Sequence, residues 1–101
     1  MNIVDRAKAI IEPLGSMINL VTFDAIDIKK AYVETSADPL MVILNYPMLD
    51  EINSKLHPYL RKAIKDYVKT KNFYAGQITL WPTLTIKLYA ERRITPAWEP
   101  D

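Results

Sequence analysis

The stretch ITLWPTLTIKLYAE, residues 78–91, decides the architecture of this chain. Apolar residues occupy alternate positions, and threonine, lysine and aromatic residues stand between them, a pattern typical of a strand that covers a core on one side. Pro82 has no N–H to give to a neighbouring strand, so it is tolerated only at an edge or a bulge. A three-residue hairpin here would normally require a glycine in left-handed geometry, and none is present. We therefore predict one strand over residues 77–91, bent at Pro82, that either lies at a sheet edge or passes from one pairing partner to another at Pro82.

An apolar edge strand of this length is either blunted or paired with another chain. Pro82 and Lys87 are the residues that would blunt it. Without effective blunting, a partner strand or a second copy would add to the edge. The sequence leaves both alternatives open.

The chain begins with a predicted helix over residues 3–12. Apolar residues recur there at helical spacing on one face, and Asn2 is a suitable N-cap. Pro13 disfavours helical geometry at the residue before it, and Gly15 admits a sharp turn. Both residues predict that the helix ends near residue 12.

The next segments read as strands and loops. Residues 17–23 are rich in β-formers and predict a strand, whereas residues 24–33 fit a short helix and a strand equally well. Residues 34–39, ETSADP, form a loop by their turn residues. Residues 40–46 are a continuous apolar run between two prolines, which predicts a strand buried on both faces.

From Leu49 to Val68 the apolar period changes to that of an amphipathic helix. Pro58 interrupts this helix, because it lacks an N–H and its ring crowds the preceding turn, so we expect a kink or a fresh helix start there. The predicted fold is therefore α+β: an N-terminal helix, a twisted sheet of three or four strands, and one long amphipathic helix packed on one face. Residues 1–94 form a single domain, and residues 95–101 form a proline-rich extended tail.

Composition fits a globular domain. Of the 101 residues, 50% are hydrophobic and 25% are charged, and there are no cysteines, which excludes disulfides and thiolate chemistry. The N-terminus carries charges and does not read as a secretory signal, and the most apolar run is far shorter than the roughly 20 residues of a spanning helix. We expect a cytoplasmic protein, or a virion component if the source is viral.

Basic residues concentrate on the long helix. Six of the 13 lysines and arginines, and only one acidic residue, fall within residues 55–71. Four of the lysines share the face opposite the apolar stripe: Lys55, Lys62, Lys65 and Lys69. This face could neutralise phosphates, but the net charge of +1 and the ordinary amphipathic pattern favour a solvated face over a nucleic-acid site.

No catalytic, cofactor or metal motif is present in the sequence. His57 is the only histidine and has no neighbouring partner that would orient a general base. Asp24 and Asp27 offer too few oxygens for a magnesium or calcium site. With two glycines in the chain, a glycine-rich phosphate loop is excluded. We predict a non-enzymatic protein without a cofactor.

The predicted partner surface combines the long strand with the tail. Trp98 lies between two prolines in a segment too short to build its own structure, and such a residue either folds back on its domain or anchors a neighbour. Aromatic and arginine side chains are favoured at interface centres. The predicted partner-binding residues are Trp81, Thr83, Thr85, Tyr89, Arg92, Arg93 and Trp98.

These observations favour an assembly or interaction protein that binds a protein partner or itself, with a homo-oligomer expected. A small structural subunit, an accessory subunit and a viral or phage virion component are all of this class. Two alternatives are a nucleic-acid-binding protein that uses the Lys55–Lys71 face and a small monomeric inhibitor of a protein partner.

Overall fold

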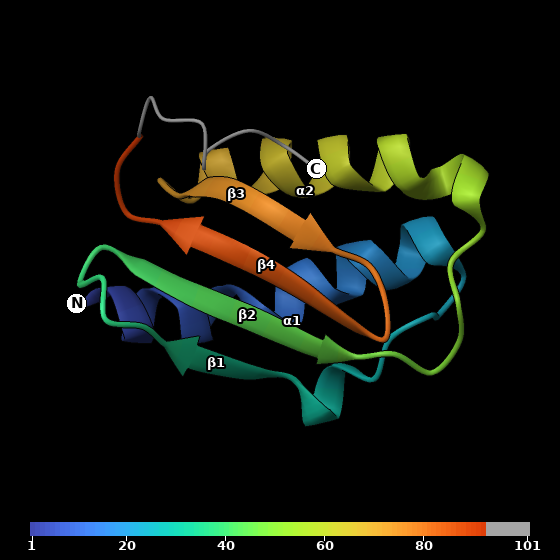
Figure 1. Ribbon diagram of the computed structural model, residues 1–101, viewed down its shortest axis with the longest axis horizontal. Coiled ribbons are helices and arrows are strands. Elements are labelled where there is room, and N and C mark those ends of the chain that lie inside the picture. The colour runs from blue at the N-terminus through green and yellow to red at the C-terminus, as the bar shows by residue number, and fades with distance from the viewer. Residues whose placement is uncertain (93–101) are drawn as a thin grey trace.

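A computed structural model of the chain describes residues 1–92. Two helices cover one face of a four-stranded antiparallel sheet, and no described helix covers the other face (Figure 1). The sheet order is β1-β2-β4-β3. The elements are α1 Ile3–Thr22, β1 Tyr32–Thr35, β2 Met41–Pro47, α2 His57–Thr70, β3 Tyr74–Thr79 and β4 Thr83–Tyr89, with 3₁₀ turns η1 Ile28–Lys30 and η2 Ser54–Leu56. The predicted α+β class is confirmed.

Helix α1 starts where the sequence predicts but runs ten residues further. The side chain of Asn2 accepts a hydrogen bond from the Asp5 N–H at 2.8 Å, as expected of an N-cap. The predicted end at residue 12 and the predicted strand over 17–23 are wrong. Pro13 is exposed and removes only the bond to the carbonyl four residues earlier, while the apolar stripe continues through Leu14 and Ile18 into the core. Burial of that stripe outweighs the lost hydrogen bond.

Gly15 allows close packing of α1 and does not form a turn. A Cβ atom at this position would lie 3.0 Å from both Ile28 Cγ1 and Tyr46 Cε1. The Tyr46 hydroxyl donates to the carbonyl oxygen of Ile11 at 2.6 Å, which fixes the ring against the helix. Burial raises the pKa of Tyr46 well above its usual range, so the hydroxyl stays protonated and remains a donor. The glycine therefore lets α1 approach β2 and η1 closely.

Residues 77–91 form a hairpin and not one bent strand, so that prediction is wrong. Strands β3 and β4 pair with Ile78 opposite Ile86 and Thr79 opposite Thr85, and the chain turns through Leu80–Pro82. The Trp81–Pro82 peptide bond is cis. The turn is made without the glycine that the sequence argument required, and the odd loop length keeps the apolar residues of both strands on one face. Of these two strands, only β3 lies at a sheet edge, because β4 lies between β2 and β3.

The segment before β2 is neither the helix nor the single strand considered for residues 24–33. It contains an isolated bridge between Ile26 and Met48, the turn η1 and the start of β1. Strand β2 is confirmed, and its predicted burial on both faces holds only in part, because Asn45 on the face away from the helices is buried but Ile43 is not. Its helix-facing residues are buried under α1, whereas Ile43 on the other face is only half-buried because no described helix lies over it.

Helix α2 is a fresh start, one of the two arrangements predicted at Pro58. The chain from Leu49 to Asn53 is not helical, η2 follows, and Pro58 lies in the first turn of α2. An N–H at that position has no intrahelical acceptor, so proline loses nothing there.

Changing Pro58 to alanine is therefore expected to alter the free energy of unfolding by less than about 0.5 kcal/mol, because no helical hydrogen bond is restored. Ala63→Pro in the middle of the same helix is the matched control and should cost about 3 kcal/mol or more. Chemical denaturation of both variants measures the difference. A large loss for Pro58→Ala would mean that the proline ring itself is needed for packing.

The two helices are joined at the end of the molecule opposite the hairpin. The Arg6 guanidinium donates through Nη2 to the carbonyls of Lys71 at 3.3 Å and Asn72 at 2.9 Å. It also lies 4.3 Å from the centre of the buried Phe73 ring. A cation thus occupies the negative end of the α2 dipole and ties it to α1.

Candidate functional site

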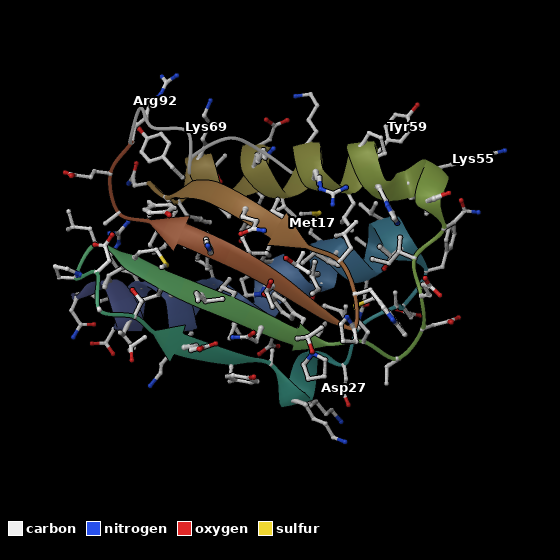
Figure 2. All side chains as sticks on the ribbon, in the orientation of Figure 1. Met17, Asp27, Lys55, Tyr59, Lys69 and Arg92 are labelled. Carbon is white, nitrogen blue, oxygen red and sulfur yellow. The ribbon has the colours of Figure 1, made fainter. Side chains whose placement is uncertain are left out.

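Several exposed apolar residues belong to segments that meet at one end of the molecule, where α1 and β2 end, α2 begins and the β3–β4 hairpin turns, which is the right side of Figure 1. We call this the hairpin end. Four large residues there are strongly exposed: Leu20 (81%), Phe23 (85%), Leu49 (65%) and Trp81 (50%). We call these four residues the apolar end patch. Tyr59, in the first turn of α2, is also exposed (Figure 2).

Backbone pairing brings the three segments of the patch to the same end. The Leu49 N–H donates to the carbonyl of Ala25 at 2.8 Å, two residues after Phe23. Pro47 at the end of β2 is paired with Thr83 at the start of β4. The turn that carries Trp81 comes directly before Thr83 and therefore lies at the same end of the sheet. The patch is therefore built from segments far apart in the sequence.

Phe23 is held in a conformation that glycine normally occupies. It follows the last residue of α1 with φ 59° and ψ 51°, and Asp24 after it also has a positive φ of 69°. A non-glycine residue in this left-handed region costs roughly 1–2 kcal/mol. The backbone N–H groups of both residues point to the Asn19 carbonyl. A strained phenylalanine that gains almost no burial indicates a role other than stability.

The loop behind Phe23 is firmly fixed. The Asn19 side chain donates to the Ile26 carbonyl at 3.2 Å and accepts from the Ile26 N–H at 3.0 Å. The Thr22 hydroxyl donates to the carbonyl of Ile18 and accepts from the N–H of Ala25. These bonds present Phe23 on a preordered backbone, which lowers the entropy lost when a partner binds.

The predicted partner-binding residues that the structure describes lie in the hairpin turn, on β4 and just after β4. Trp81 lies in the hairpin turn, while three others lie on the interior strand β4, away from any edge: Thr83, Thr85 and Tyr89. Arg92 is exposed after β4. Arg93, Trp98 and the predicted tail over 95–101 lie outside the described residues. Tyr89 covers Gly76 of β3, where an added Cβ would come within 2.8 Å of the ring.

The outer strands carry features that oppose strand addition. The register of β3 shifts between Ala75 and Ile78, and Arg61 of α2 donates to the Ile78 carbonyl at 3.5 Å. At the other edge, β1 has only four residues and includes the exposed Glu34. Short, irregular and charged edges are poor templates for another strand. An interface at the hairpin end or on the sheet face is therefore better supported than an edge.

Three of the four lysines of the predicted basic face, Lys55, Lys62 and Lys69, are exposed, while Lys65 is half-buried. Lys62 pairs with Asp66 at 2.8 Å, which lowers the charge of the face. Lys55 and Lys69 lie at opposite ends of the helix region (Figure 2). The arrangement is that of an ordinary solvated helix surface.

We expect no tight nucleic-acid binding by this face. In a gel-shift titration at low salt, any complex should be weak and should disappear as salt approaches physiological levels, because few phosphates can be neutralised. Changing Lys62, Lys65 and Lys69 to glutamate should make little difference. Tight binding that those three changes abolish would contradict this expectation.

Two side chains that the sequence analysis considered for chemistry lie beside backbone groups. His57 Nε2 lies 3.2 Å from the Ile52 carbonyl, and Asp27 accepts the Lys29 N–H at 3.2 Å as a cap of η1. Within residues 1–92, no three acidic or histidine residues are grouped closely enough to hold a metal ion. No helix in this range is long and apolar enough to cross a membrane.

Comparison of the chain with protein-family models, curated proteins and solved structures finds no match.

Sequence reasoning missed three members of the patch. Leu20 and Phe23 were placed in a predicted strand, and Leu49 in the apolar stripe of the long helix. Continuing the 100° helical rotation of α1 past Pro13 would have placed Leu20 opposite the buried stripe, beside Ser16. The positive φ of Phe23 has no sequence signal, because phenylalanine does not favour it.

Proposed function

We propose that this chain is a non-enzymatic interaction protein that binds a protein partner through the apolar end patch. The observation that carries the proposal is Phe23, 85% exposed on a strained but well-ordered backbone. Large aromatic side chains that are exposed and preordered are the usual anchors of protein interfaces. An accessory subunit, a virion component and an inhibitor would all use such a surface.

The chemistry around the patch supports a protein partner. Leu20, Leu49 and Trp81 extend the apolar surface beyond Phe23, and the exposed acidic residues Asp50 and Glu51 lie directly after Leu49. An apolar centre with charged residues at its rim is the common plan of protein–protein interfaces. Acidic groups beside the patch disfavour a phosphate-bearing partner.

Site-specific photocrosslinking in the cells that produce the protein tests this proposal. A benzoylphenylalanine in place of Phe23 nearly preserves the native side chain, and a second probe replaces Trp81. Glu12, exposed on the outer side of α1, provides the control position. We expect the same discrete adduct from positions 23 and 81 and none from position 12. No adduct from either patch position, or the same adduct from all three, would contradict the proposal.

A further inference from the structure

The sheet face turned away from the helices carries few charges. Its residues alternate with the buried ones of β2 and β4, so Ile43, Asn45, Thr85 and Lys87 belong to it. Glu34 of β1 joins them, because it is paired with Ile43 and cross-strand partners share a face. Glu34 and Lys87 are the only charged residues of this face in the described strands. The face is mixed: Ile43, the buried Asn45 and Thr85 stand between one acidic and one basic residue.

The two charges are placed symmetrically. Glu34 is paired with Ile43 from one side of β2, and Lys87 is paired with the same Ile43 from the other side. The three residues form one row across the sheet with the isoleucine in the middle. Asn45 donates to Glu34 Oε1 at 3.2 Å and so holds the carboxylate over the face.

We propose that a second copy of this chain binds this face, forming a symmetric dimer whose twofold axis runs close to β2. Rotation about such an axis exchanges the positions of β1 and β4. Lys87 of the second copy then lies over Glu34, Glu34 of the second copy lies over Lys87, and the two Ile43 residues meet at the centre. Packed sheets lie about 10 Å apart, a gap that a glutamate and a lysine can close from opposite sides.

Other symmetric arrangements fail on charge. A twofold axis along β4 would place Lys87 against Lys87 of the second copy. An axis across the strands, through the row, would place Glu34 against Glu34 and Lys87 against Lys87. Like charges at an interface are strongly unfavourable, so the row accepts one orientation of a second copy and rejects these two. The two ion pairs therefore fix the orientation, while Ile43 and the threonines supply the contact.

The contact area is limited to one small four-stranded sheet, so the dimer belongs to the weak class of interfaces below about 1,200 Å² in total.

The test is sedimentation equilibrium of the full chain at about 100 µM, a concentration suited to weak association. The variants are Glu34→Lys and Lys87→Glu, each alone and mixed one to one. Lys8→Glu and Glu12→Lys on the exposed side of α1 make matched changes of charge away from the face.

We expect a dimer for the native chain and for both controls, and a dimer dissociation constant raised by at least about ten-fold in each face variant, because each variant places two pairs of like charges together. The mixture should recover a dimer containing one copy of each variant, since the lysine introduced at position 34 then faces the glutamate introduced at position 87, and native Lys87 faces native Glu34. Circular dichroism checks that each variant is folded. A monomeric native chain overturns the proposal. The proposal is also overturned if the chain dimerises only after residues 93–101 have been removed. A mixture that stays monomeric, or face variants that dimerise like the native chain, also overturns it.

This dimer is independent of the apolar end patch. Changing Phe23 and Trp81 to serine should leave the dimer intact, and loss of dimer in that variant would place the self-association at the hairpin end instead.

Discussion

Replacing Gly15 with valine is expected to lower the free energy of unfolding by about 3 kcal/mol, the upper part of the range for overpacked cores. The added Cβ would lie 3.0 Å from Tyr46 and from Ile28, and the two further methyl groups have no space in the buried contact. Tyr46 cannot easily move, because its hydroxyl is bonded to the Ile11 carbonyl. Chemical denaturation measures the loss.

Two further variants show that the cause is the contact and not helix propensity. Gly15→Ala should cost about 1 kcal/mol net, since overpacking opposes the gain that alanine brings to a helix. That cost should shrink in an Ile28→Ala background, where one of the two neighbours is truncated. Ser16→Ala, exposed on the same turn, should be neutral or slightly stabilising. Equal stability of Gly15→Val and the native chain would show that α1 does not pack on β2 as described.

Arg6→Ala is the second large change, with an expected loss of about 2 kcal/mol. The guanidinium bonds two carbonyls at the end of α2 and stacks on Phe73, so its removal separates the start of α1 from the α2–β3 connection. The measurement is again the free energy of unfolding from denaturant titration.

Arg6→Lys should recover only part of this loss, because an ammonium keeps the charge at the end of α2 but lacks the planar fork and stacks less well. Lys8→Ala, exposed on the same helix, is the control and should change stability by no more than about 0.5 kcal/mol. If Arg6→Ala behaves like Lys8→Ala, the helices are held together by their apolar contacts alone.

Where the sequence predicts the fold correctly, the signal is an apolar pattern matched by burial. The N-cap at Asn2, the strand over residues 40–46 and the helix after Pro58 all follow from such patterns. The errors arise at Pro and Gly residues in both directions: Pro13 and Gly15 were interpreted as a helix stop, and the turn at Pro82 was interpreted as a continuous bent strand. Pro13 is tolerated on an exposed face, and Gly15 allows a close approach that depends on Tyr46, a residue 31 positions away.

The candidate site was harder to predict, because it depends on tertiary arrangement. Trp81 stood out in the sequence as an exposed aromatic, and it does lie in the apolar end patch. The other residues of the apolar end patch come from α1 and from the connection after β2. No local sequence pattern predicts that these two segments lie close to the hairpin. The hairpin also separates Trp81 from the sheet-face residues Thr83, Thr85 and Tyr89, which one bent strand would have kept on the same edge.

We propose that Phe23 is kept for binding at the expense of stability. Phe23→Gly removes the left-handed strain and little buried surface, so the free energy of unfolding should rise by about 0.5–1 kcal/mol after allowing for the greater freedom of glycine in the unfolded chain. The most direct measurement combines this value with the yield of photocrosslinked partner from position 81 in the same variant. We predict a more stable protein whose crosslinked partner is largely lost. A Phe23→Gly protein that crosslinks as well as the protein with native Phe23 would contradict the account.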